Sequence, residues 1–169
     1  MVAAFALSTS AAHADAGAEA EAGFGAGGWN AEQTSIVDFR FAVGGHFDVG
    51  RDLVLHTGLV ADILLVDTTT NNGLVELGAY TSMAWPLGSG WSIGPRVAFE
   101  VVEKPIAFVG VRVAHRPVAF GIDAVHMFAA EKPTGVIASA SLTGKAGAWG
   151  IAIGGVLALL FAAGSRGNG

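Results

Sequence analysis

Apolar and polar residues alternate along most of this chain. In the stretch SIVDFRFAVGG, residues 35–45, Asp38 and Arg40 lie between Val and Phe side chains at every second position. Successive side chains of a β-strand point to opposite faces, so a strand here places its apolar residues on one face and both charges on the other. The pattern therefore predicts a strand with two chemically different faces.

The same period of two recurs in segments bounded by Gly, Pro, Asn and Asp. It predicts strands over residues 18–28, 35–45, 53–65, 75–85, 91–101, 107–115, 118–128 and 136–143, and a ninth segment over residues 149–161. The ninth segment has almost no polar face. Bacterial single-chain barrels have even strand numbers. We therefore expect eight strands, or ten if Gly154 and Gly155 bend the last segment into a hairpin.

Composition indicates a membrane environment for these strands. Of the 169 residues, 52% are hydrophobic and only 14% are charged, and the mean hydropathy is +0.55. These values are too apolar for an ordinary soluble domain. The longest apolar run, residues 149–163, is shorter than the ~18 residues typical of a membrane-spanning helix. In hydrocarbon the remaining way to pair every backbone N–H and C=O is a closed sheet, so we predict an all-β, antiparallel, up-and-down transmembrane barrel.

The alternation alone fits a second barrel, in which the apolar face lines a cavity and the polar face meets water, as in soluble lipocalins. Two features favour lipid outside. The three lysines, Lys104, Lys132 and Lys145, all fall in predicted connections, whereas a water-facing sheet commonly carries Lys along its strands. The polar face is otherwise filled with Gly, Ala and Ser, which suits a narrow, crowded interior.

The tryptophans give a third indication. Trp85 and Trp91 flank the connection PLGSG, and Trp149 follows the connection TGKAG, so the three are expected at one end of the barrel. Trp29 is expected at the other rim. Aromatic residues gather at both membrane interfaces in transmembrane barrels. We therefore predict these four side chains to be interface aromatics.

The polar face then points into the lumen. The predicted interior network consists of Asp38, Arg40, His56, Asp62, Glu76, Tyr80, Arg96, Glu100, Arg112 and Asp123, and the same face carries Glu19, Glu21 and Arg116. These charges nearly neutralise one another. An eight-stranded barrel is only wide enough for its own side chains, so we expect a hydrogen-bonded network of ion pairs that plugs the lumen. A narrow pore or carrier for small solutes is the alternative.

The strand rhythm, the aromatic girdles and the final run Leu157-Ala158-Leu159-Leu160-Phe161 resemble the small outer-membrane β-barrels of Gram-negative bacteria, the class of the outer-membrane protein A transmembrane domain. The resemblance covers about residues 18 to 161. It implies contact with outer-membrane lipids and insertion by the barrel-assembly machinery. The stretch MVAAFALSTSAAHADA has an A-x-A site at residues 12–14, which predicts a signal peptide remnant over residues 1–14 before a single barrel domain over residues 15–169.

Other chemistries find little support. The chain has no cysteine, no clustered histidines and no phosphate-binding Gly loop, so no metal and no cofactor are predicted. A net charge of -5 without a basic patch disfavours nucleic acid. A lipid-modifying enzyme is less favoured, because neither His115 nor His126 has a nucleophile two residues away. The sequence predicts a non-enzymatic barrel with a structural or interaction role, and it identifies no protein partner.

Overall fold

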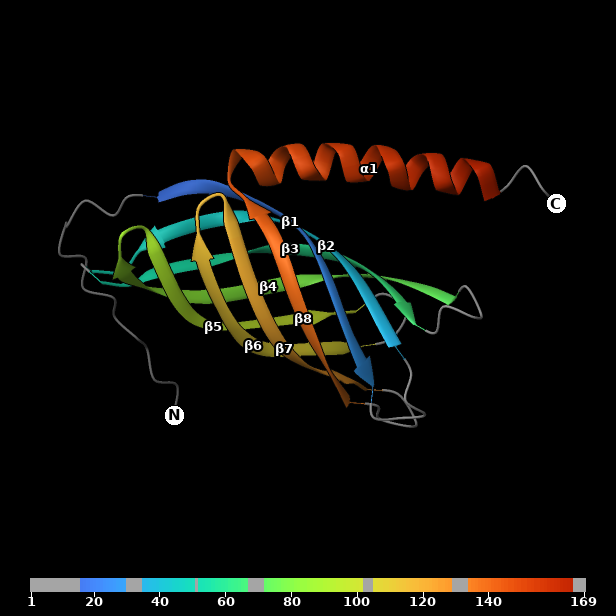
Figure 1. The fold of residues 1–169 in the computed structure, drawn as a ribbon, viewed down its shortest axis with the longest axis horizontal. Helices are drawn as coiled ribbons and strands as arrows, with labels where there is room; N and C mark the ends of the chain where they lie inside the picture. The colour runs from blue at the N-terminus through green and yellow to red at the C-terminus, as the bar shows by residue number, and fades with distance from the viewer. Residues whose placement is uncertain are drawn as a thin grey trace, which may run out of the picture.

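Eight antiparallel strands form a closed barrel, and one helix follows them (Figure 1). The computed structural model describes residues 16–29, 35–50, 52–66, 72–101, 105–128 and 134–165, so the predicted leader lies outside the described residues. The elements are β1 (Ala16–Trp29), β2 (Ser35–Asp48), β3 (Val54–Val66), β4 (Asn72–Gly88), β5 (Trp91–Glu100), β6 (Ile106–His115), β7 (Val118–Met127), β8 (Thr134–Thr143) and α1 (Lys145–Ser165).

Each strand pairs with its neighbour in sequence, and β8 pairs with β1 to close the sheet. Phe24 of β1 shows the closure, because it lies opposite Phe39 of β2 on one side and Ala140 of β8 on the other. A closed sheet has no free edge of unpaired N–H and C=O groups. The predicted all-β, up-and-down barrel of eight strands is confirmed.

The two ends of the barrel differ in their connections. At one end the turns Ser89–Gly90 and Arg116–Pro117 join β4 to β5 and β6 to β7 directly. Gly88, Ser89 and Gly90 all have positive φ angles, the conformation that glycine adopts most easily and that allows so short a reversal. We call this end, at the left of Figure 1, the tight-turn end. The connections between β1 and β2 and between β3 and β4 lie at the opposite end.

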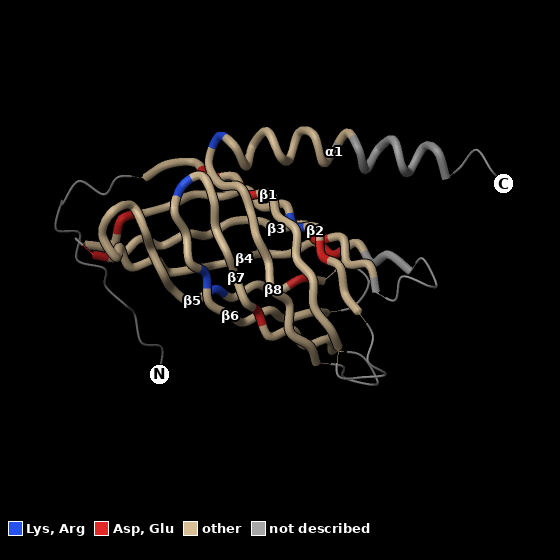
Figure 2. The backbone as a smooth tube through the Cα atoms, in the orientation of Figure 1, with Lys and Arg blue, Asp and Glu red and all other residues tan. Residues whose placement is uncertain are grey.

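The two faces of each strand have the chemistry that the alternation predicts. Figure 2 shows where the charged residues lie along the strands. Apart from Asp48 at the end of β2, every Asp, Glu and Arg of the strands is buried. The outer face exposes large apolar side chains on all eight strands, for example Phe24, Phe39, Leu59, Leu77, Phe99, Val109, Ile122 and Val136. The charged residues thus lie inside, and apolar residues cover the outside.

The last predicted segment, residues 149–161, is a helix and not a strand. It belongs to α1, which packs on the outside of the barrel against β1 and β8 (Figure 1). The segment lacks alternating polar residues, and without them nothing favours the period of a strand over that of a helix. Gly147, Gly150 and Gly154 recur every three or four residues and face the wall. A Cβ at Gly150 would lie only 2.6 Å from the Cβ of Ala22. Small residues thus allow the helix to approach the sheet closely.

The exposed face of α1 is also apolar. Trp149, Ile153 and Val156 are 71%, 59% and 57% exposed. A helix that is apolar on all sides normally has apolar surroundings on all sides. Within the described ranges, no helix is both long enough and apolar enough to cross a membrane.

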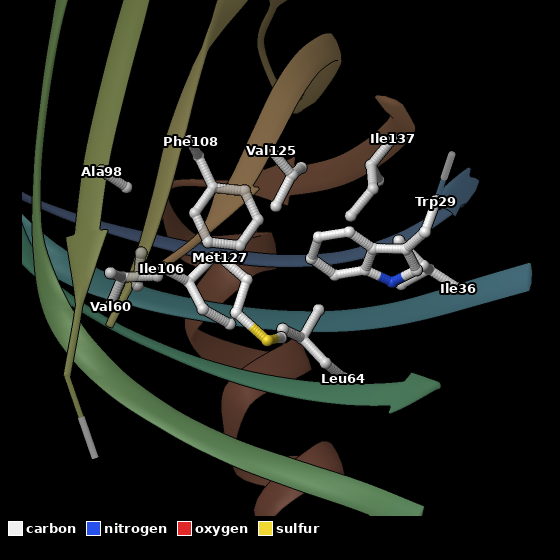
Figure 3. Close-up of a cluster of buried hydrophobic side chains, with 11 residues drawn as sticks. Trp29, Ile36, Val60, Leu64, Ala98, Ile106, Phe108, Val125, Met127 and Ile137 are labelled. Carbon is white, nitrogen blue, oxygen red and sulfur yellow. The ribbon is translucent and has the colours of Figure 1, made fainter. Parts of the chain in front are cut away.

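An apolar cluster lies in the barrel interior, from its middle to the end opposite the tight turns. Figure 3 shows its side chains. Its members are Trp29, Ile36, Ala42, Val60, Leu64, Ala98, Ile106, Phe108, Val125, Met127 and Ile137. The prediction that Trp29 is an interface aromatic is wrong, because its side chain is 5% exposed. Trp29 is an even number of residues from Glu19 and Glu21, so it points inward as they do.

The close contacts of the α1 glycines with the barrel wall predict that a larger side chain at one of these positions destabilises the protein. We expect Gly150→Leu to lower the free energy of unfolding by about 1–3 kcal/mol, because the new side chain would collide with Ala22 of β1. The control is Ala152→Leu, which adds a leucine at an exposed position of the same helix and should be nearly neutral. Urea titration of the protein in detergent micelles measures both variants. Equal effects would contradict this packing.

Candidate functional site

The polar lumen is the candidate functional site. It extends from the tight-turn end to the level of the apolar cluster, where Asp62 lies between Val60 and Leu64 on the inward face of β3. It contains all ten residues of the predicted network. Nine of these side chains are buried, and Tyr80 is half-buried against the apolar cluster. Each comes from the inward face of a strand, so the closure of the sheet brings together residues that are far apart in sequence.

Arg40 of β2 lies at the centre of the first group of charges. Its Nε donates to both carboxylate oxygens of Asp62, each at 2.9 Å, and its Nη2 also donates to Asp62. The guanidinium lies 3.9 Å from Asp38, 3.7 Å from Glu100 and 3.8 Å from Asp123. Its planar fork suits such shared contacts, because arginine remains charged when buried. One cation therefore holds carboxylates from four strands.

The same guanidinium connects the charges to the apolar cluster. Its Cζ lies 4.5 Å from the centroid of the Phe108 ring, within the range of a cation–π contact. Sequence alternation places Phe108 on the inward face of β6, but the partner of an aromatic ring across a barrel depends on register and shear. This contact could not be read from the sequence.

Arg96 of β5 and Arg112 of β6 form the second group. The Nε of Arg96 donates to Asp123 at 3.2 Å, its Nη2 also donates to Asp123, and its Nη1 lies 3.6 Å from Glu21. Arg112 Nη2 donates to Glu21 at 2.9 Å, and the Ser141 hydroxyl donates to the other Glu21 oxygen at 2.7 Å. Asp123 is shared with Arg40, so the two groups form one network. Ser141 is absent from the predicted network.

A histidine–carboxylate pair lies closest to the tight turns. His56 Nδ1 forms a hydrogen bond with Glu19 Oε2, and both side chains are buried. The His46 ring lies 6.2 Å from the His56 ring, centroid to centroid. Glu76 is fully buried and lies opposite Asp62 in the register of β3 and β4.

The lumen is more acidic than the sequence predicts. Arg116, expected on the inward face, is exposed in the turn between β6 and β7, because β6 ends at His115. The buried charged side chains of the described strands are Glu19, Glu21, Asp38, Asp62, Glu76, Glu100 and Asp123 against Arg40, Arg96 and Arg112. The described lumen thus has one base fewer than expected, and Arg40 and Arg96 are each shared by more than one carboxylate.

Little space remains among these side chains. The cavity between the ion-pair groups, lined by residues such as Arg40, His56 and Tyr80, has a volume of about 10 Å³, roughly that of a single water molecule. Beyond His56 the lumen widens into an open cavity of about 390 Å³ at the tight-turn end, lined among others by Trp91 and His115. The described side chains thus fill the middle of the barrel and leave this open cavity, which we call the cup, at the tight-turn end.

The other three tryptophans are exposed near the tight-turn end. Trp85 and Trp91 are 44% and 42% exposed, and the Trp91 ring lies 4.9 Å from the His115 ring, centroid to centroid. Trp149 lies near the start of α1 and not on a strand. In the described part of the chain, no group of three or more His, Asp or Glu residues is arranged to hold a metal ion.

No protein-family model matches the chain, and no curated protein matches it significantly in sequence. Among solved structures it is similar to a chain from the de novo design of transmembrane β-barrels. The identity is 14%, the TM-score is 0.43, and the match covers 75% of this chain and 95% of that one.

The shared role of Arg40 predicts a large effect of its removal. We expect Arg40→Met to lower the free energy of unfolding by about 3–5 kcal/mol, because Asp62 and its neighbours lose their cation inside the barrel. Arg116→Met, the same substitution in an exposed turn, should change it by no more than about 0.5 kcal/mol. Urea titration in detergent tests both. The network would have no such role if the two variants unfolded alike.

Proposed function

We propose that this chain is an integral outer-membrane β-barrel whose lumen is plugged and which has a structural or interaction role. One observation carries the proposal: the outer face of all eight strands is apolar, while the buried charges lie in the lumen.

The apolar outer surface of the barrel is unfavourable in water. Soluble monomers rarely expose contiguous apolar patches larger than a few hundred Å². Here apolar side chains are exposed around the whole barrel, including Leu59 at 66% and Ile122 at 62%. A soluble lipocalin-like barrel would instead turn its apolar faces inward and its charges outward. The apolar outer face of α1, with Trp149 and Ile153, supports the same environment.

The filled lumen favours a plug over a pore. The apolar cluster occupies one end, the ion pairs of Arg40, Arg96 and Arg112 occupy the middle, and about 10 Å³ remains between them. An ion crossing this region would have to displace paired charges. A narrow pore or carrier remains the second candidate, because the cup at the tight-turn end opens to the exterior.

The lumen gives little support to catalysis. Ser82 lies opposite His56 in the register of β3 and β4, and His56 is bonded to Glu19, which is a chemically suggestive set. All three line the cavity of about 10 Å³, which has no room for an acyl or glycosyl substrate, and of the three only Glu19 and His56 also line the open cavity of about 390 Å³. Among the described residues, His56 is hydrogen-bonded to Glu19 and not to Ser82. A non-enzymatic role is therefore the better proposal.

The bacterial outer membrane is the location that we propose, with outer-membrane lipids around the barrel and the barrel-assembly machinery as its transient partner. The support is the resemblance in strand rhythm to small outer-membrane barrels, the three exposed tryptophans near the tight-turn end, and the A-x-A site after the apolar N-terminal stretch.

The membrane environment predicts a depth-dependent cost of charge. Val109 lies in the middle of β6 and is 56% exposed, so Val109→Arg should destabilise the inserted barrel by about 2–4 kcal/mol. The matched control, Val101→Arg just beyond the end of β5, should cost only about 0–1 kcal/mol. Urea titration in phospholipid vesicles measures both. A soluble barrel would tolerate both substitutions within about 0.5 kcal/mol.

The plugged lumen predicts that the protein conducts no ions across a bilayer. After reconstitution into planar bilayers, the wild-type protein should give no stable conductance, because ion pairs and the apolar cluster fill the lumen. A porin reconstituted in parallel controls for insertion. Reproducible single-channel steps from the wild-type protein would favour the pore.

A further inference from the structure

An apolar groove lies between α1 and the barrel wall. It has a volume of about 450 Å³, and its lining includes Ala22, Phe24, Ala140, Leu142, Gly150 and Ile153. The groove exists because both sides are built partly from small residues, which bring the helix close to the sheet yet leave space beside it. Its size lies in the range of small-molecule sites, ~300–1,000 Å³.

A basic cavity lies at the start of the helix, at the tight-turn end. It has an open volume of about 770 Å³, and Arg116 and Lys145 both line it. Within the described ranges these two are the only exposed Lys or Arg side chains, and neither forms an ion pair with a described carboxylate. Glu19 also lines the cavity, but its carboxylate is bonded to His56. The cavity is therefore positively charged.

Two polar features add to this positive site. The first hydrogen bond within α1 runs from the Ala148 N–H to the Gly144 carbonyl, so the N–H groups of the first turn have no partner inside the helix. The first turn contains no acidic residue that would offset the helix dipole. Thr143 also lines the cavity; the residue is 2% exposed, and its buried hydroxyl has no hydrogen-bond partner among the described residues.

The groove and the basic cavity follow one another along β1 and α1. Ala18 and Ala20 of β1 line the basic cavity, and Ala22, two residues further on the same outward face, lines the groove. On α1 the groove begins at Gly150, two residues after Ala148 of the cavity. The cations lie at the same end as the exposed tryptophans, the level at which lipid headgroups meet aromatic side chains.

We propose that this surface binds one anionic glycerophospholipid, with its phosphate at Arg116, Lys145 and the first turn of α1 and an acyl chain in the groove. The proposal rests on the membrane location proposed above, since only there do lipids surround the helix. The positive charge of the basic cavity favours an anionic headgroup. The apolar groove favours a ligand with an acyl chain over free phosphate.

The test measures which lipid the protein retains. The full chain is refolded into vesicles of equimolar phosphatidylglycerol and phosphatidylethanolamine, extracted in mild detergent and examined by native mass spectrometry. We expect the wild-type protein to retain one phosphatidylglycerol molecule in preference to phosphatidylethanolamine. The variant R116Q/K145Q should lose this preference, by roughly fivefold for each cation. The control K104Q/K132Q removes the same charge elsewhere in the sequence and should retain it.

A second pair of variants tests the groove. Ala140→Leu fills the groove and should reduce retention of the lipid, whereas Ala138→Leu adds the same bulk at an exposed position of β8 outside it and should not. The proposal would be overturned if the wild-type protein retained both lipids equally, or if R116Q/K145Q retained as much phosphatidylglycerol as its control. It would also be overturned if added glycerol phosphate, which has no acyl chain, displaced the bound lipid completely. Failure of the wild-type chain to insert into vesicles would instead contradict the membrane location.

Discussion

The pairing of β8 with β1 is the constraint on which the rest of this structure depends. It converts a two-faced sheet into a closed surface with an inside and an outside, and it leaves no strand edge exposed. Because side chains alternate along each strand, closure assigns every second residue to the lumen. Asp38 and Arg40 lie inside for this reason, and so do the carboxylates that Arg40 binds from β3, β5 and β7.

Closure also determines how polar and apolar groups share the available space. Ten charged side chains are buried in the lumen, where they need partners, since an unpaired buried charge is costly. Arg40 and Arg96 each lie close to more than one carboxylate, Arg112 pairs with Glu21, and the apolar cluster around Phe108 and Trp29 fills the far end. The outer surface is left to apolar residues, and α1 adds a further apolar element outside β1. The lipid environment that we propose would account for the apolar wall and the apolar helix together.

Much of the fold could be predicted from the sequence, because the period of two is a strong signal and because a closed sheet follows from the need to pair the backbone. The same period placed the ten network residues on one face. It could not supply their partners: the contacts between Arg112 and Glu21 or between Arg40 and Phe108 depend on register and shear. The segment after Gly144 was mispredicted because it has no alternation to read. Trp29 was misplaced because an aromatic near a strand end was assigned by type, and not by its position in the alternation. Arg116 was misplaced because the alternation was extended beyond the end of β6 at His115.

The central claim is that acyl chains, and not water, surround the middle of the barrel wall. Nuclear Overhauser effects from lipid acyl protons to backbone amides, measured in lipid nanodiscs, test it most directly. The account predicts acyl cross-peaks at central strand residues such as Val97, Val109 and Ile122, with water cross-peaks confined to the ends of the barrel. Water cross-peaks at those three positions, without acyl contacts, would contradict it.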